Sequence, residues 1–108
     1  MYEKGVRNFV VCSAGVLEKL DGVNYVVVKD SLQAMQNLAS FHRSQFDLPV
    51  VAITGSNGKT IVKEWLNQLL SNRYQIIRSP RSYNSQIGVP LSVWEMEENH
   101  QLAIFEAG

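Results

Sequence analysis

The segment VVAITGSNGKTIVKEWL, which begins at Val50, restricts the fold of this chain more than any other stretch of its 108 residues. Its first residues, Val50–Ile53, form a continuous apolar and β-branched run, which is typical of a buried parallel strand. A glycine-containing turn follows, and Lys59–Leu70 then shows the spacing of an amphipathic helix. The apolar face expected for this helix consists of Val62, Trp65, Leu66 and Leu69. A strand, a glycine turn and a helix in this order place backbone N–H groups and the positive end of the helix dipole where an anion can bind.

The residue types in the turn suit a nucleotide phosphate. Gly55 and Gly58 allow the backbone to approach phosphate oxygens closely, and Lys59 can reach the outer phosphates as a point charge. The Thr60 hydroxyl is placed to bind Mg²⁺. The common pattern G-x-x-x-x-G-K-[ST] is not fully kept, because Ile53 stands where that pattern has its first glycine. A merely solvated lysine is the alternative, but its charge would oppose the dipole at a helix N-terminus.

The segments that follow predict a parallel α/β sheet. Tyr74–Ile77 and Leu102–Phe105 have the composition of strands, and a short helix with Pro90 in its first turn is expected to extend through Trp94. From Val50 onward, the order is therefore strand, helix, strand, helix, strand. This alternation predicts right-handed crossovers between parallel strands.

The residues before Pro49 predict a smaller α/β segment. Asn8–Cys12 and Asn24–Val28 have the composition of short strands, and the SAGVLEKLDG stretch between them is long enough for one or two helical turns. Asp30 and Ser31 offer an N-cap for a helix that ends before Pro49. The apolar stripe of that helix consists of Leu32, Met35, Leu38, Ala39, His42 and Phe46. The predicted fold class is thus α/β, a parallel sheet with a phosphate loop preceded by a small α/β segment.

Charge and composition exclude several classes of function. Ten basic and ten acidic residues cancel, so no nucleic-acid partner is expected, since such partners need a concentrated positive field. No apolar run approaches the roughly 18 residues of a membrane-spanning helix, so membrane insertion is not expected. The single cysteine, Cys12, cannot form an internal disulfide, which fits a reducing cytoplasm. Its apolar neighbours predict that Cys12 is buried.

Other conspicuous residues are explained better by packing or solvation than by chemistry. Met35, Trp65 and Trp94 stand at helical spacing beside other apolar residues, which predicts core packing. His42 lies on or beside an apolar stripe, so a hydrogen-bonded structural histidine is expected there. His100 and the acidic stretch EMEE lie in a polar turn without further ligands placed to complete a metal site, and both are expected to be solvated.

Three stretches, in this order and spacing, resemble the Mur ligase family, whose members extend the peptide of the peptidoglycan precursor. AITGSNGKT resembles the family's ATP loop, NSQIGVPLSV its N-x-x-x-G-x-P segment, and AIFEAG the strand that ends in a magnesium-binding glutamate. Within the family, IGVPL and VVVKDSLQAMQNLASFHR are most similar to the branch that adds D-alanyl-D-alanine to UDP-N-acetylmuramoyl-tripeptide. GKTIVKEW and RSPRSYNSQIGVPLSVW further resemble the form of that branch fused to an alanine racemase.

The resemblance implies an activity and a set of site residues. ATP would phosphorylate the terminal carboxylate of the UDP-linked tripeptide, and the amine of D-alanyl-D-alanine would then displace phosphate. Lys59 and Asn84 would be catalytic, and Thr60 and Glu106 would bind Mg²⁺, each of them a separate ion. The residues implied to hold the ATP phosphates are Thr54, Gly55, Ser56, Asn57, Gly58, Lys59 and Thr60. Pyridoxal phosphate would be needed only by a racemase domain fused downstream.

Several of these assignments have alternatives. Asn84 could instead stabilise a turn, and Gln86 could take its polar role. Glu106 could be a solvated strand end, although the carboxyl end of a parallel strand beside the phosphate loop favours the metal. Arg78 and Arg81 could meet substrate phosphates or lie in a solvated loop.

The resemblance also implies a larger enzyme. Residues 1–48 would be the end of an N-terminal UDP-substrate-binding domain with its connecting helix, and residues 49–108 the N-terminal part of the central ATPase domain. The isolated piece is expected to be inactive and to expose sheet edges and helix faces through which it could self-associate. The competing hypotheses are an unrelated phosphate-loop kinase or NTPase, and a non-catalytic interaction module whose glycine turn is only structural.

Overall fold

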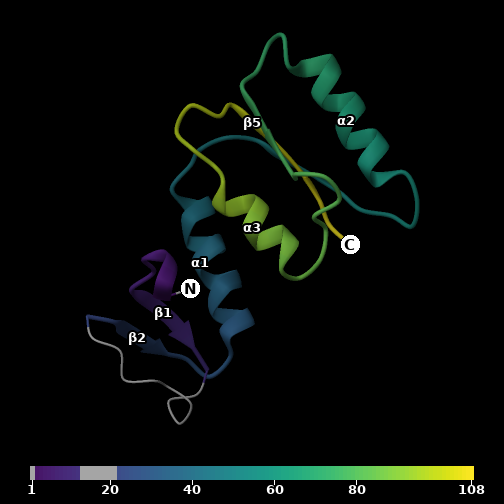
Figure 1. The fold of residues 1–108 in the computed structure, drawn as a ribbon. Coiled ribbons are helices and arrows are strands. Elements are labelled where there is room, and N and C mark those ends of the chain that lie inside the picture. Colours follow the sequence, from purple (N-terminus) through teal and green to yellow (C-terminus); the bar gives the residue numbers. More distant parts are fainter. Residues whose placement is uncertain (1, 13–21) are drawn as a thin grey trace. The chain divides into compact units, whose positions relative to one another are not determined.

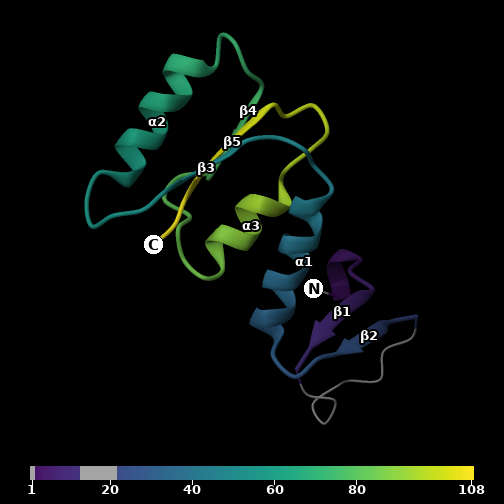
Figure 2. The same cartoon turned by 180° about the vertical axis from the view of Figure 1, so that it is seen from behind.

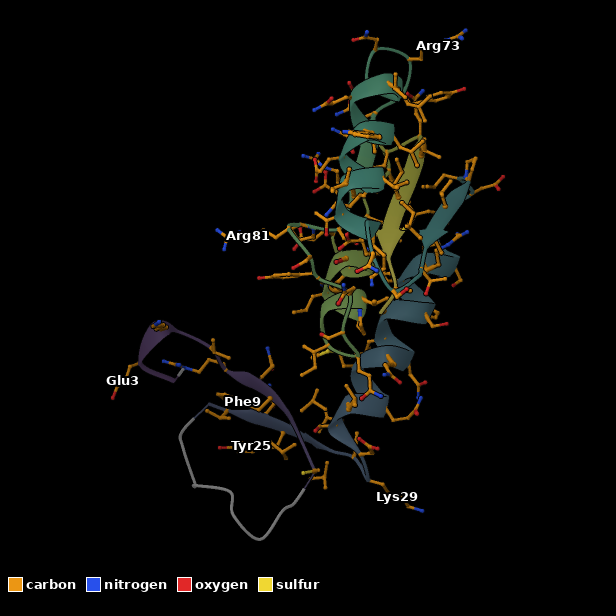
Figure 3. All side chains as sticks on the ribbon, turned by 90° about the vertical axis from the view of Figure 1, so that its right-hand side faces the viewer. Glu3, Phe9, Tyr25, Lys29, Arg73 and Arg81 are labelled. Atoms are coloured by element: carbon orange, nitrogen blue, oxygen red, sulfur yellow. The ribbon has the colours of Figure 1, made fainter. Side chains whose placement is uncertain are left out.

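Two short parallel strands form the N-terminal part of the computed structural model, which describes residues 2–12 and 22–108 (Figure 1). A 3-10 turn, η1 (Tyr2–Lys4), precedes β1 (Asn8–Val11), which pairs in parallel with β2 (Asn24–Val27). The rings of Phe9 and Tyr25 stack across the two strands with their centroids 5.6 Å apart (Figure 3). The helical turns expected in SAGVLEKLDG fall almost entirely on residues 13–21, which lie outside the described residues.

The chain divides into two compact units, Met1–Ala34 and Met35–Gly108, and the division falls within helix α1 (Ser31–Ser44). The predicted cap of α1 is confirmed, because Asp30 Oδ1 accepts the N–H groups of Leu32 and Gln33 at 3.0 and 3.2 Å. The expected boundary between residues 48 and 49 concerns the domains of a parent enzyme and stays a prediction.

Two expectations from composition concern Cys12 and the membrane. Cys12 is exposed, so the prediction that it is buried is wrong. The reason is that β1 belongs to a two-stranded sheet whose pairing ends at Val11, and Cys12 lies beyond this end.

In the part of the chain that the structure describes, no helix has both the length and the apolar character needed to cross a membrane.

A three-stranded sheet forms the centre of the second unit. Its strands are β3 (Val50–Ile53), β4 (Ile76–Arg78) and β5 (Leu102–Glu106), arranged in the order β3-β5-β4. All pairings are parallel, so the predicted parallel sheet is confirmed. Strand β4 begins two residues later than expected, because the N–H of Tyr74 still bonds to Leu70 O at the end of the preceding helix.

Helices α2 (Lys59–Leu70) and α3 (Gly88–Trp94) lie on opposite sides of this sheet (Figures 1 and 2). Successive side chains of β5 alternate between these two faces. The core on the α3 side consists of Leu48, Ile77, Met96, Ala103 and Phe105, with Phe46 and Val93 packed against it. The other face of β5 carries Leu102, Ile104 and Glu106 on the side of α2.

The last strand, not the first, is the buried one. All five residues of β5 are buried, whereas Val50 and Val51 of β3 are 37% and 39% exposed. The prediction that Val50–Ile53 is a buried strand is therefore wrong. Its continuous apolar run indicated a central strand, but β3 lies at an edge of the sheet, with β5 as its partner on one side.

Helix α2 packs with a face that its apolar spacing did not predict. Trp65 and Leu69 are 63% and 74% exposed, while Lys63 is completely buried. Leu66 is the partly buried member of the predicted apolar face. The prediction that Trp65 packs in the core is therefore also wrong. The side of α2 that faces inward is the one that carries Lys63, because the backbone carbonyls of Ser79 and Arg81, just after β4, accept hydrogen bonds from its ammonium.

Trp94 is the last residue of α3, and His42 of α1 contacts it. His42 Nε2 donates to Met96 O at 2.9 Å, and its ring lies 4.5 Å from that of Trp94. The predicted structural role of His42 is confirmed. Trp94 is 51% exposed, so the prediction that it packs in the core is wrong, and its ring contacts that of His42 instead. His100 is half-buried and its Nδ1 accepts the N–H of Glu97 at 2.9 Å.

Candidate functional site

The loop between β3 and α2 has the backbone of an anion-binding turn. Gly55 and Gly58 adopt φ angles of 137° and 79°, which side chains on L-residues disfavour. Gly58 occupies the N-cap position of α2 and has no side chain to cap it. The N–H groups of the first helical turn are thus left for another acceptor, and the helix dipole favours a negatively charged one.

Lys59 and Asn84 both lie at this loop. A hollow of about 280 Å³ is lined by Ser56, Asn57, Gly58, Lys59, Thr60, Ile61 and Asn84. Lys59 is partly exposed, and its Nζ donates to Gly55 O at 2.6 Å, so its charge lies over the loop. Asn84 reaches the hollow from the irregular segment before α3. The structure therefore brings together most residues predicted to hold phosphates and both residues predicted to be catalytic.

Glu106 lies at the end of β5, beside the start of the loop. Its register partner on β3 is Ile53, and the next residue, Ala107, donates its N–H to Ile53 O at 2.8 Å. The Glu106 side chain is fully buried. Among the described residues, none donates a hydrogen bond to either of its carboxylate oxygens. A buried carboxylate in this condition is costly unless a cation accompanies it.

The two predicted metal ligands occupy different surroundings. Thr60 lines the loop hollow, while Glu106 is buried and does not line it. Within residues 2–12 and 22–108, no group of three or more His, Cys, Asp or Glu side chains is gathered as a metal centre. The donor set nevertheless fits Mg²⁺, which is commonly held by one or two protein oxygens together with water and substrate phosphates.

Sequence reasoning missed Lys63 and Ser79, which surround Glu106. Lys63 Nζ donates to Ser79 O at 2.8 Å and to Arg81 O, and it lies 3.9 Å from Glu106 Oε2. Ser79 Oγ accepts the N–H of Glu106 at 2.9 Å. The available signal was spacing, because Lys63 follows Lys59 by one helical turn and therefore shares its side of α2.

The other polar candidates lie outside the loop hollow. Arg78 forms an ion pair with Glu64 at 3.2 Å, and the side chain of Arg81 projects away from the ribbon (Figure 3). Burial raises the pKa of Glu64, but the hydrogen bond and charge of Arg78, followed by the charge of Lys63, outweigh burial and lower that pKa overall.

Gln86 and Asn84 both line a second hollow, of about 410 Å³, between α1 and α3.

Comparisons with known proteins place this arrangement in a family. The fold and the loop define the class first, as a parallel α/β domain with a glycine turn at a helix N-terminus, beside a buried carboxylate. The family model for the Mur ligase middle domain matches residues 53–108, more than half of the chain. The chain belongs to the Mur ligase family.

Curated relatives agree with this assignment. The UDP-N-acetylmuramoyl-tripeptide–D-alanyl-D-alanine ligase of Treponema pallidum is 41% identical over 88 residues, covering 81% of this chain and 19% of that protein. The ligase of the same name from Bacillus subtilis is 36% identical over 83 residues, covering 77% of this chain and 18% of that protein. The chain thus spans about a fifth of the length of the curated relatives it matches.

Solved structures show the same fold. MurF from Acinetobacter baumannii superposes with a TM-score of 0.81 at 33% identity, over 92% of this chain and 21% of that one. MurF ligase from Thermotoga maritima, solved in complex with ADP, gives a TM-score of 0.76 at 24% identity, over 95% of this chain and 30% of that one.

Proposed function

We propose that these residues belong to an ATP-dependent ligase that joins D-alanyl-D-alanine to UDP-N-acetylmuramoyl-tripeptide in the synthesis of the peptidoglycan precursor. The names of the curated relatives support this reaction. The observation that carries the proposal is the glycine loop with Lys59, beside the buried Glu106 carboxylate, which accepts no hydrogen bond from the described residues and has Lys63 Nζ 3.9 Å away. The first feature suits a polyphosphate, and the second suits the cation that accompanies it.

The proposed reaction has two steps. The γ-phosphoryl group of ATP passes to an oxygen of the tripeptide's terminal carboxylate, and ADP leaves. The amine of D-alanyl-D-alanine then attacks the carbonyl carbon, the amide bond forms, and phosphate leaves with loss of a proton from the amine. Phosphoryl transfer of this kind depends on positioning and on the neutralisation of charge.

This chain would contribute the phosphate side of the site. The loop amides at residues 54–60 would bind the β- and γ-phosphates, and Lys59 would release Gly55 O and turn its ammonium towards the transferred group. Asn84, which lines the same hollow, would orient the phosphates or the peptide carboxylate. Thr60 and Glu106 would hold Mg²⁺, which when bound neutralises phosphate charge.

The decisive experiment measures phosphate release by the longest natural polypeptide that contains these 108 residues. Release that requires both UDP-N-acetylmuramoyl-tripeptide and D-alanyl-D-alanine is expected. Release that is indifferent to D-alanyl-D-alanine would favour an unrelated kinase or NTPase. A protein that binds no nucleotide, with or without Mg²⁺, would instead be an interaction module.

Variants of the two metal candidates test the cation site within the same assay. Thr60→Ala and Glu106→Gln should each lower the rate, and high Mg²⁺ should recover part of the loss, because each contributes one ligand among several. A loss that no Mg²⁺ concentration reduces would count against both as ligands. Lys59→Ala serves as the matched comparison, since its loss should be independent of Mg²⁺.

Two further predictions concern the extent of the protein. The 108-residue chain by itself should not turn over UDP-N-acetylmuramoyl-tripeptide, because it spans only about a fifth of the relatives. Turnover by the purified chain would contradict this.

The resemblance to the racemase-fused form stays a prediction, which the complete coding sequence and an alanine racemisation assay with pyridoxal phosphate would test.

A further inference from the structure

Lys63 is buried to a degree that is unusual for a lysine. Its side chain has no solvent-exposed surface, and lysines are almost never fully buried unless they are paired. The ammonium has three N–H donors, and two backbone carbonyls, of Ser79 and Arg81, accept hydrogen bonds from it. Its nearest carboxylates are Glu64 Oε1 at 3.5 Å and Glu106 Oε2 at 3.9 Å.

The carbonyl acceptors belong to a turn that is itself tied to Glu106. Ser79 is fully buried, its N–H donates to Ile104 O at 3.1 Å, and its Oγ accepts the Glu106 N–H at 2.9 Å. Arg81 has a φ of 51°, which is uncommon for a residue with a side chain. Lys63 therefore holds an irregular turn in place, and that turn holds the backbone of Glu106.

Lys63 also connects Glu106 to the glycine loop. It follows Lys59 by four residues and Thr60 by three, and such residues lie on one side of a helix. One rigid helix therefore carries the loop lysine, the candidate metal hydroxyl and the buried ammonium beside the candidate metal carboxylate. If the contacts of Lys63 were lost and this turn of the helix moved, the distance between Thr60 and Glu106 would change.

We propose that Lys63 is a positioning residue that fixes the Glu106 carboxylate relative to the loop so that the two together bind a divalent cation with the nucleotide. This inference rests on the proposed function, because it takes Glu106 as a metal ligand. Lys63 itself touches neither the nucleotide nor the cation. It acts through Ser79 on the backbone of Glu106 and through its charge on the carboxylate.

Simple electrostatics and positioning predict opposite effects when Lys63 is removed. A positive charge 3.9 Å from a metal ligand repels a second cation, so its loss would tighten Mg²⁺ binding if Glu106 kept its place. If Lys63 sets that place, its loss weakens Mg²⁺ binding. Substitution of residues that orient metal ligands typically costs about ten- to a hundredfold in metal affinity.

The test uses the longest natural polypeptide that contains these residues and a non-hydrolysable ATP analogue. Affinity for the analogue is measured in EDTA and over a series of Mg²⁺ concentrations, for wild type, Lys63→Met and Ser79→Ala, with thermal melts of each. Lys29→Met, which replaces an exposed lysine, is the matched control. Mg²⁺ should increase the affinity for the analogue, and the Mg²⁺ concentration that gives half of this increase should be about tenfold higher in Lys63→Met than in wild type. The change should be smaller in Ser79→Ala, and the affinity measured in EDTA should stay the same in both variants.

Each other outcome overturns the proposal. Equal losses with and without Mg²⁺ would make Lys63 merely structural, and tighter Mg²⁺ binding would make it only a counter-charge. If Lys63→Met does not fold, Ser79→Ala decides, because it keeps the ammonium and removes only the acceptor of the Glu106 N–H. If the affinity of the wild-type protein for the analogue does not depend on Mg²⁺, the proposed cation site and this inference both fail. If the wild-type affinity depends on Mg²⁺ and the substitutions do not change that dependence, only this inference fails.

Discussion

Helix α2 (Lys59–Leu70) carries two lysines one turn apart in opposite surroundings. Lys59 lies over the glycine loop and is reached by solvent, whereas Lys63, Ser79 and Glu106 form a cluster whose side chains have no exposed surface. In the loop, water can solvate any charge that lacks a partner, so function can change there with little effect on folding. In the buried cluster a charge that loses its partner has no exposed surface through which to be solvated, so every change to a charge affects the fold and the site together.

The largest effect should follow from breaking the buried cluster. Lys63→Met leaves Glu106 as an uncompensated buried charge, which should lower the free energy of unfolding by about 3–5 kcal/mol. Adding Glu106→Gln should recover part of this loss, because the remaining charge is then removed as well. Urea denaturation of the single and double variants measures both changes. A single variant within about 1 kcal/mol of wild type would show that the cluster is not closed to water.

Lys59→Ala should have the reverse profile in the active enzyme. In the proposed reaction Lys59 faces the transferred phosphoryl group, and loss of one preorganised charge there should lower the rate roughly a hundred- to a thousandfold. The thermal midpoint should hardly move, since Lys59 fills no core space. Lys59→Arg should also be slow, because a planar guanidinium does not replace a compact ammonium. Near-normal turnover in Lys59→Ala, or a loss explained by unfolding, would make the glycine turn a scaffold.

Gly58 allows the conformational demand of the loop to be measured separately from its chemistry. A Cβ built at this position meets nothing within 4 Å, so the cost of Gly58→Ala comes from its φ of 79° alone. We expect a loss of about 1–2 kcal/mol in unfolding free energy. Gly58→Asn is the matched control and should cost less, because asparagine tolerates this conformation. Equal costs for the two variants would point to a steric cause instead.

The smallest effect should come from Glu64, a partly exposed residue beside the buried cluster that pairs with Arg78. Its side chain is 38% exposed, so its pair with Arg78 should contribute no more than about 0.5 kcal/mol. Because folding lowers the pKa of Glu64, this contribution is complete above the ordinary value of 4.5 and disappears as the pH falls through the lowered value. The stability difference between wild type and Glu64→Gln should therefore shrink from pH 7 to pH 3, and a difference that grows would contradict it.

Sequence reasoning predicted local structure around the loop well. Val50–Ile53 and Lys59–Leu70 match β3 and α2 residue for residue, because a β-branched run, a glycine turn and an amphipathic repeat are all local signals. It failed for the side of α2 that turns inward. Apolar spacing predicted that Trp65 and Leu69 face the core. Lys63 faces the core instead, because its ammonium donates to the carbonyls of Ser79 and Arg81, which are distant in sequence.

The candidate site was predicted in the same uneven way. The candidate residues within the loop follow from their types, and Glu106 and Asn84 from resemblance to a family rather than from physics. The burial of Glu106 was not foreseeable from the chain, because it depends on β5 lying between β3 and β4. No local pattern states which of three parallel strands is central.

That strand order has a consequence for synthesis on the ribosome. Strands β3 and β4 do not pair with each other, and each finds its hydrogen-bonding partner in β5, which emerges last of the three. The glycine loop is therefore translated long before the strand that completes its surroundings. Pairing over such long sequence separations slows folding and leaves strand edges exposed in the meantime. Until Leu102–Glu106 has emerged, the nascent chain carries the glycine loop without the sheet that would hold it, and it is then that chaperones or proteases would meet it.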